Sequence, residues 1–377
     1  MTDLAIAVTA APPQRLAVAS QAQLVWWAFQ RHKLAMAGLV VTVVLYVIAA
    51  IPGFFAINDP TAQNARTPYH PPEAVEIFAP GGGLAWPHFT PEKLSRDPDT
   101  LATIYQPLND HPVGLVLFGH GFSYRLLGLF DTDIHLLASA DKAYPFYPLG
   151  SDRLGRCVWS RMMQGAQISM SVGLVGVALS LIIGIVLGGI SGYFAGRIDF
   201  VIQRVIEFVL ALPTIPIWLA MAAALPQGWP ATLQYMMITI ILSLTGWAQL
   251  ARVVRGRFLT LRTEEFVAAA RLDGCSEARI IFRHMLPSFA SHIIASISLA
   301  IPAMILAETA LSFLGLGLQP PTISWGVLLR EAQNVRSIAT APWLFAPGAA
   351  VVLAVMALNL LGDGLRDVLD PKLVRRS

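Results

Sequence analysis

Two carboxylates occupy apolar stretches of this chain, where a charged side chain is costly to bury. Glu207 follows Arg204 near the expected end of a helix, so an interfacial ion pair is the favoured interpretation. Glu308 has Thr309 and Ser312 nearby, which favours a protonated or hydrogen-bonded structural carboxyl. A proton relay through Glu308 is the alternative chemistry.

The other residue types that commonly catalyse reactions or bind metals do not occur at a spacing typical of such sites. Five histidines between residues 58 and 167 have neither HExxH nor closely paired spacing, so we interpret them as solvated or turn residues and predict no metal site: His70, His88, His111, His120 and His135. The sequence contains no GxxxxGK[ST] phosphate loop, no GxSxG elbow and no nucleophile–base set. We therefore predict that the chain is not an enzyme and binds no cofactor itself.

The composition indicates a membrane protein that crosses the bilayer several times. Of 377 residues, 55% are hydrophobic and 13% charged, against roughly 25% charged in soluble domains. The net charge of +3 is not arranged as a basic stripe, so no nucleic-acid partner is expected. Cys157 and Cys275 are expected on opposite sides of the membrane, which excludes a disulfide between them.

Six apolar runs are long enough to cross the lipid bilayer as helices of about 20 residues. They cover 34–57, 168–194, 200–224, 233–250, 291–314 and 343–362. Pro213 and Pro216 interrupt the third run, which neighbouring helices can tolerate. The predicted fold class is an all-α polytopic membrane protein with six transmembrane helices.

Arginine and lysine positions predict the orientation. Seven arginines lie in the loop 251–290: Arg252, Arg255, Arg257, Arg262, Arg271, Arg279 and Arg283. The positive-inside rule then places this loop, a loosely ordered N-terminal lead (1–33) and the tail (363–377) in the cytoplasm. The helices after the first form a five-helix core over 168–362.

Residues 58–167 are consequently expected outside, as a large insert between the first two helices. Its many prolines and the run Gly81–Gly83 predict an irregular structure without a large core. Within it, 116–130 (VLFGHGFSYRLLGLF) is apolar, but His120 and Arg125 favour an external or interfacial hairpin over a span. No internal repeat is evident, which argues against a secondary transporter.

Glycines recur every fourth residue through the second span, and this spacing places them on one helical face: Gly184, Gly188, Gly192 and Gly196. Small residues at this spacing allow close helix approach. Ordinary tight packing is the favoured interpretation, and a surface that slides during gating is the alternative.

A compact helix–Gly–helix pattern covers 266–287 (FVAAARLDGCSEARIIFRHMLP), within the basic loop. Its first half favours a helix through Ala268, Ala269, Ala270 and Arg271. Gly274 permits the left-handed turn that ends this helix, Ser276 is placed to cap a second one, and Pro287 is expected to stop it. Such a structured cytoplasmic loop indicates a docking site for a partner.

This segment resembles the EAA loop of ABC-importer permeases, whose pattern is EAA, three residues, Gly, nine residues and then His-x-Leu-Pro. The matching positions are Ala269, Ala270, Gly274, His284, Leu286 and Pro287, whereas Ala268 replaces the usual Glu. Three further segments, 148–173, 307–329 and 358–373, are similar to the oligopeptide/dipeptide branch. In the first of them, Ser151, Cys157, Gln164 and Gln167 depart from the pattern of the branch.

The resemblance implies a type I permease fold and a C-type permease subunit of a peptide importer in the bacterial inner membrane. A second permease would complete a heterodimer, two cytoplasmic ATPase subunits would bind ATP and Mg, and an extracytoplasmic binding protein would deliver the peptide. The 266–287 loop would couple the spans to one ATPase. The alternatives are a stand-alone secondary transporter or channel, a membrane-anchored receptor and an intramembrane enzyme. The cargo stays open among dipeptides, oligopeptides, glutathione-like peptides and nickel chelates.

Overall fold

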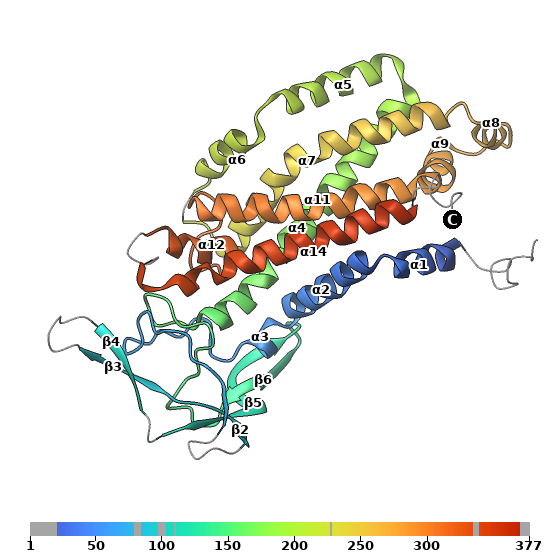
Figure 1. Cartoon of the computed structure of the whole chain (residues 1–377). Helices are drawn as coiled ribbons and strands as arrows, with labels where there is room; N and C mark the ends of the chain where they lie inside the picture. The colour runs from blue at the N-terminus through green and yellow to red at the C-terminus, as the bar shows by residue number, and fades with distance from the viewer. Residues whose placement is uncertain are drawn as a thin grey trace, which may run out of the picture.

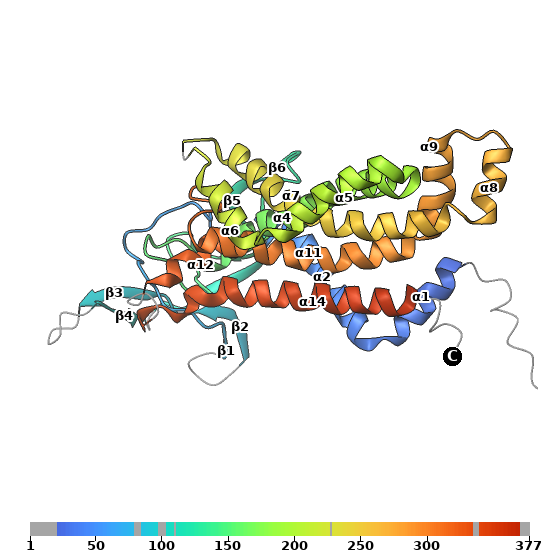
Figure 2. The same cartoon turned by 90° about the horizontal axis from the view of Figure 1, so that it is seen from above.

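The computed structural model describes residues 21–78, 84–96, 103–108, 111–226, 228–334 and 339–369. Long helices run side by side, and a β-rich part lies at one end of them (Figures 1 and 2). Over the described residues, five helical segments are long and apolar enough to span a membrane: α2 (Lys33–Ala50), α4 (Val158–Phe194), α7 (Ala231–Leu261), α11 (Ala290–Phe313), and η3 (Pro342–Phe345) with α14 (Ala346–Leu369). A sixth span results if the bent pair α5 (Gly196–Ala211) and α6 (Thr214–Ala223) is counted as one.

Each predicted span overlaps one of these segments, but several helices extend further than their apolar runs. Helix α4 includes residues 158–167, which were predicted to belong to the insert, and α7 includes 251–261, which were predicted to be loop. The first run instead divides into α2 and a short turn, α3 (Pro52–Phe55). Hydropathy detects only the lipid-buried part of a helix, so polar ends that continue the same backbone hydrogen bonding are missed.

Part of the N-terminal lead is helical, which differs from the prediction of a loosely ordered segment. Residues 21–31 of the predicted loose lead form helix α1 (Gln21–Arg31). Phe29 of α1 is buried against Ala35 of α2 and Val368 of α14. Residues 1–20 of the lead and 370–377 of the tail lie outside the described residues.

The third span bends by 85° between α5 and α6, at the predicted prolines. Pro213 has no N–H to continue the helix and disfavours a helical backbone at the residue before it. Leu212 accordingly adopts an extended conformation, with φ −81° and ψ 136°. The proline position therefore determines where this span breaks.

Helix α4 packs against α2, α7 and α11 and lies at the centre of the helical part. One buried cluster joins four of the long helices through Leu45 of α2, Met170 of α4, Ile305 of α11 and Val351 of α14. These close contacts fix the relative positions of the helix ends at which the polar features described below are located.

The described residues of the insert between α3 and α4 include six strands, so the prediction of an irregular structure is wrong there. The strands are β1 (Glu76–Phe78), β2 (Leu84–Phe89), β3 (Glu92–Arg96), β4 (Thr103–Pro107), β5 (Val113–Leu126) and β6 (Phe130–Ser139). An antiparallel sheet has the order β1-β2-β5-β6, and β3 pairs with β4 separately. The hairpin predicted within 116–130 is present as β5–β6 but extends over 113–139, with Leu117 opposite Leu137. The run Gly81–Gly83 lies outside the described residues.

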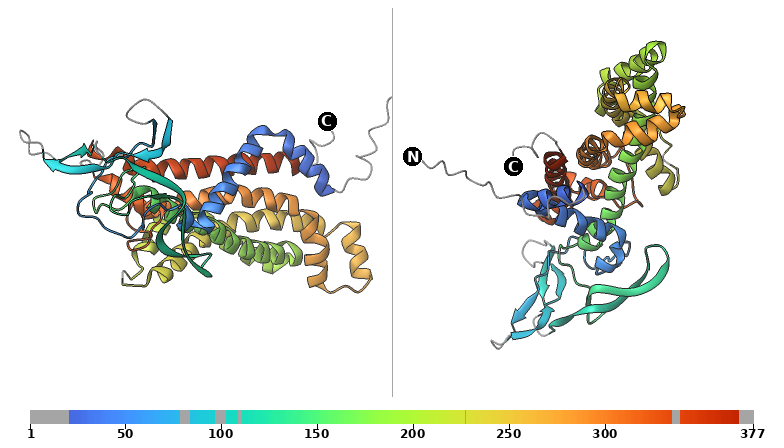
Figure 3. Two further views of the ribbon diagram at one scale, coloured as in Figure 1. Left: turned by 90° about the horizontal axis from the view of Figure 1, so that it is seen from below. Right: turned by 90° about the vertical axis from the view of Figure 1, so that its right-hand side faces the viewer.

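A small core holds the insert against the N-terminal end of α4. It contains Ile57, Phe89, Val113, Leu115 and Phe146, all of which are buried. Two short helices between α11 and α14 lie at the same end, α12 (Trp325–Arg330) and η2 (Glu331–Gln333). Figure 3 shows this end from two further directions.

Candidate functional site: the connector between α7 and α11

The connector between α7 and α11, residues 262–289, lies at the end of the helices opposite the insert (Figures 1 and 2). Four short elements form it: α8 (Glu265–Leu272), α9 (Glu277–Arg279), the π-helical turn η1 (Ile280–Met285) and α10 (Leu286–Ser288). The helix–Gly–helix arrangement expected from the sequence is thus present in this loop.

Gly274 ends the first of these helices in a left-handed conformation, with φ +72°. The Cys275 N–H donates to the Ala270 carbonyl at 3.1 Å, and the Gly274 N–H donates to Arg271 at 3.0 Å. This pair of bonds is the Schellman pattern, in which glycine at the left-handed position satisfies the last carbonyl groups of a helix. The reversal of chain direction between α8 and α9 therefore depends on the backbone freedom of one residue.

The second helix of the connector differs from the sequence prediction at both ends. Ser276 occupies the N-cap position, but its side chain makes no capping hydrogen bond; its carbonyl accepts the Ile280 N–H instead. Pro287 does not stop the helix, because it lies at the start of the turn α10, where an N–H is not required, and the helix ends at Ser288.

Buried side chains on one side of the connector join it to three spans. Val267 and Ala270 of α8 and Ile280 and Met285 of η1 pack in one cluster with residues of the long helices: Tyr193 of α4, Val254 and Phe258 of α7, and Phe289 and Ile293 at the start of α11. The Arg271 guanidinium lies 5.3 Å from the centre of the Tyr193 ring, a cation–π distance. A force applied to the connector would therefore reach α4, α7 and α11 together.

The other side of the connector exposes apolar side chains. Leu272 is 89% exposed, Phe282 59% and Phe266 41%. Sequence reasoning did not single out these three residues, although apolar side chains among exposed arginines are a recognisable sign of a docking surface. Of the predicted loop residues, Ala270 is buried, His284 and Leu286 are half-buried, and the rest are exposed, namely Ala268, Ala269, Arg271, Gly274 and Pro287.

Three of the four spaced glycines lie against α7. A Cβ added at Gly188 would be 2.4 Å from the Ala251 carbonyl oxygen, and one at Gly192 would be 2.6 Å from that of Arg255. Gly184 faces the Leu250 side chain. The prediction that Gly196 shares this packing face is wrong. Gly196 follows the end of α4 with φ +63°, and no atom lies within 4 Å of its added Cβ. The four-residue spacing describes one face of a helix only as far as Phe194, where α4 ends.

A half-buried charge pair lies beside the Gly192 contact. Arg255 of α7 donates through Nε and Nη2 to the two carboxylate oxygens of Asp199 in α5, at 2.5 and 2.6 Å. The Ser191 hydroxyl of α4 donates to the same carboxylate at 2.5 Å. Three helices are thus joined at the end that bears the connector, by residues that the sequence did not mark because 56 positions separate Asp199 from Arg255.

The two carboxylates within apolar runs both have partners. Glu207 and Arg204 form an exposed ion pair at 2.7 Å, as predicted. Glu308 is fully buried and accepts hydrogen bonds from the hydroxyls of Ser169 at 3.1 Å and Ser312 at 2.9 Å. The predicted hydrogen bonding of Glu308 is therefore confirmed.

A cavity of about 350 Å³ lies among α4, α6, α7 and α11. Its walls are mostly apolar but include five serine, threonine and glutamine side chains, which are Ser180, Thr214, Thr245, Gln249 and Ser296. The Trp218 indole N–H of α6 donates to the Thr245 hydroxyl at 3.0 Å and orients both groups at its wall. The bent span thus contributes directly to a polar-lined space between the helices.

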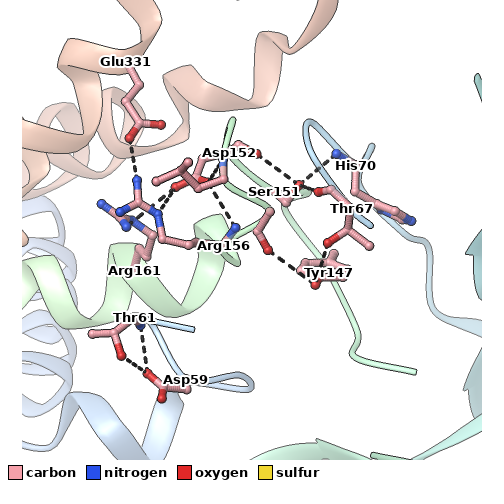
Figure 4. A network of polar contacts seen from close by, with 12 residues as sticks. Asp59, Thr61, Thr67, His70, Tyr147, Ser151, Asp152, Arg156, Arg161 and Glu331 are labelled. Carbon is pink, nitrogen blue, oxygen red and sulfur yellow. Dashed lines mark hydrogen bonds and ion pairs between the residues drawn. The ribbon is translucent and has the colours of Figure 1, made fainter. Parts of the chain in front are cut away.

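A network of polar contacts joins the insert to the helices at the opposite end (Figure 4). The buried Asp152 carboxylate accepts from Arg156 Nε at 2.6 Å, and Arg156 Nη2 donates to Glu331 of η2 at 2.8 Å. Arg161 of α4 lies 3.6 Å from Asp152. The Ser151 hydroxyl donates to the Thr67 carbonyl at 2.5 Å. The segment 148–157, which stood out in the sequence, therefore connects three parts of the chain.

Glu73 and His70 form a buried acid–base pair in the insert, with His70 Nε2 and Glu73 Oε1 3.7 Å apart. Burial raises the pKa of the Glu73 carboxyl to about 8, and the charge of Glu92 adds to the rise. Burial lowers the pKa of His70. Among the described residues, no group of three or more His, Cys, Asp or Glu side chains is arranged to hold a metal ion.

Replacing Glu73 by glutamine should change how the stability of the insert depends on pH. As the pH rises from about 4.5 to about 8, the unfolded state loses this proton before the folded state does, so the carboxyl costs about 1.4 kcal/mol of stability per pH unit. The amide of Glu73→Gln cannot ionise and keeps an oxygen for the Tyr147 N–H. We expect hydrogen exchange of residues 64–73 in the full chain to slow in the variant relative to wild type as the pH increases. An identical pH dependence in both proteins would contradict the buried, protonated state of Glu73.

Two family models match this chain. Residues 184–375 match the model described as binding-protein-dependent transport system inner membrane component, and residues 20–72 match the N-terminal TM domain of oligopeptide transport permease C. The chain belongs to this family of binding-protein-dependent permeases and is a multi-pass integral membrane protein. The resemblance to ABC-importer permeases inferred from its motifs, and the helical permease fold, are confirmed.

The similar proteins include several peptide permeases. The dipeptide transport system permease protein DppC of Bacillus subtilis is 39% identical over 246 residues, covering 65% of this chain and 73% of that protein. The oligopeptide permease OppC of the same organism is 36% identical over 59% of this chain and 71% of its own. The glutathione transport system permease GsiD of Pectobacterium atrosepticum is 39% identical over 60% and 72%. An inward-facing structure of the MetNI methionine ABC transporter matches 55% of this chain and 95% of its own, with 15% identity and a TM-score of 0.41.

Proposed function

We propose that this chain is one permease subunit of an ATP-driven ABC importer for peptides. The connector between α7 and α11 is the observation that carries the proposal. It offers an exposed apolar surface at Leu272, Phe266 and Phe282, and its buried side packs against α4, α7 and α11. Such a connector can receive a push from a partner and pass it to the membrane-spanning helices.

The energy would come from two cytoplasmic ATPase subunits that bind ATP and Mg, and this chain would perform no catalysis. Closure of the ATPase pair would displace the connector, and the spans would alternate between inward-facing and outward-facing states. The arginines at Arg262, Arg271, Arg279 and Arg283 support a cytoplasmic connector, with both termini on the same side and the insert outside.

The substrate would be a peptide, by analogy with the dipeptide, oligopeptide and glutathione permeases that this chain resembles. A second permease subunit would complete the pathway in the bacterial inner membrane, and an extracytoplasmic binding protein would deliver the peptide. The cavity lined by Gln249 and Ser296 would form part of that pathway.

Affinity purification of the tagged chain in mild detergent tests this proposal. We expect two P-loop ATPases and one further permease to co-purify with it, and we expect cells that lack the chain to lose uptake of labelled peptides. A triple variant, Phe266→Ser, Leu272→Ser and Phe282→Ser, should retain the second permease and lose the ATPases. Purification of a lone chain that transports without ATP would reject the proposal.

A further inference from the structure

The tip of the β5–β6 hairpin is an apolar surface that no other part of the described chain covers. Residues 126–130 read Leu-Leu-Gly-Leu-Phe and contain no polar side chain. Leu127 is 59% exposed, Leu129 75% and Phe130 66%. Leu127 and Gly128 turn the chain with positive φ, so the exposure of these side chains is a consequence of a formed turn.

Charged residues begin directly behind this tip. Arg125 pairs with Asp131 across the two strands at 3.2 Å, and both are well exposed. His120 and Asp133 form a second exposed pair further back, with 3.0 Å between His120 Nδ1 and Asp133 Oδ1. An apolar tip with a polar collar is the arrangement expected of a segment that enters the boundary between lipid chains and headgroups, while its base remains in water.

The hairpin is attached where a membrane-spanning helix ends. Gly53 of α3 comes three residues after Ala50, the last residue of α2, and the Tyr124 ring covers it so closely that an added Cβ would lie 2.3 Å from a ring carbon. The buried His135 ring lies 2.7 Å from the Gly53 carbonyl oxygen, and Phe54 contacts Phe118 with 6.2 Å between ring centres. The base of the hairpin therefore has a fixed position relative to the end of the span.

This attachment determines the level of the tip. Gly128 lies four residues beyond Tyr124, so at about 3.3 Å per residue the tip is within about 13 Å of the anchor. Figure 1 shows the hairpin turned back toward the outer end of α2, and in the end-on view of Figure 3 it stands clear of the helices. The tip thus lies beside the end of the span, where a bilayer surrounding α2 would have its surface.

The neighbouring surface of α2 is suited to lipid. Val40, Val43, Val44 and Val47 form one exposed apolar face of this helix. The hairpin that carries the apolar tip is attached at α3, directly after the end of this helix. We propose that residues 126–130 enter the lipid leaflet nearest the insert and hold the β-rich part against the membrane surface. This inference depends on the hairpin geometry and not on the transported substrate or on ATP coupling.

Spin labels on the full chain, together with the subunits that co-purify with it, can measure the depth of the tip. In a Cys275→Ser background, in which Cys157 is buried, Leu129→Cys is labelled with a nitroxide and reconstituted in vesicles of phosphatidylethanolamine and phosphatidylglycerol. Lys142→Cys, on an exposed part of the insert away from the tip, provides the matched control. The background protein without an introduced cysteine should give no signal.

We expect the label at position 129 to be relaxed by oxygen and protected from a water-soluble nickel complex, with a severalfold higher oxygen-to-nickel ratio than the label at 142. Equal ratios at both positions would overturn the proposal, because the tip would then lie in water. Protection of position 129 from both reagents would also overturn it, because the tip would then be buried in another protein. Neither result would affect the proposed transport function, which the measurement does not use.

Discussion

Replacing Gly188 by alanine should prevent α4 and α7 from reaching their normal separation. The added Cβ would lie 2.4 Å from the Ala251 carbonyl oxygen and 2.9 Å from its Cα, and both atoms belong to the backbone of α7. A side chain could rotate away, but a helix backbone can only shift as a unit. Overpacking of this kind costs about 1–3 kcal/mol, enough to reduce strongly the amount of folded protein. Thermal unfolding in mild detergent, followed by size-exclusion chromatography, should show a lower midpoint.

The adjacent glycine provides a control with the same chemical change on the same helix. A Cβ at Gly189 would be 3.6 Å from the Phe258 ring, an ordinary contact. Gly189→Ala should therefore be tolerated, and the better helix propensity of alanine should add up to about 1 kcal/mol. If the two variants unfolded at the same temperature, the close contact between α4 and α7 would not be the reason for glycine at position 188.

The membrane-spanning part could be predicted because its signals are local. An apolar run of about 20 residues has one stable arrangement in lipid, so each run overlaps a long helix or, in the third run, a bent pair of helices. Pro213 marks that bend by removing a donor. The insert could not be predicted in this way. Most of its strands are short, and their pairing joins residues such as Phe89 and Val113, between which the separate pair β3 and β4 intervenes. The prolines favour an irregular structure in the sequence, but Pro87 lies inside β2, so this signal misses the strand.

The candidate site likewise combines features that the local sequence predicts with features that depend on how the helices pack. The turn at Gly274 was predictable because it depends on the φ of one residue. The burial of Ala270 and the exposure of Leu272 depend on how α8 docks against α4 and α7, which no local pattern contains. Asp199 and Arg255 are paired only because α5 and α7 meet at that point. Ser276 matches a capping pattern, yet its carbonyl accepts the Ile280 N–H and its hydroxyl makes no capping hydrogen bond.

Replacing Gly274 by valine should abolish ATP-dependent uptake and leave insertion into the membrane intact. The residue has φ +72°, and a β-branched side chain in this region costs about 1–2 kcal/mol. No atom lies within 4 Å of an added Cβ, so backbone strain, and not a clash, is the expected cause. The strain would open the Schellman turn and change the angle between α8 and α9, although the spans themselves would be unaffected. Labelled-peptide uptake by cells, and the quantity of the chain in their membranes, measure the two effects.

Two further variants separate strain from the other effects of a larger side chain. Gly274→Asn should retain most of the uptake, because asparagine tolerates the left-handed region better than other non-glycine residues. Gly256→Val places the same side chain in open space on α7, where the backbone is helical, and should leave coupling unchanged. Normal uptake by the Gly274→Val variant would show that the shape of the connector does not matter for coupling. Equal loss in the valine and asparagine variants would instead show that uptake requires glycine for a reason other than φ.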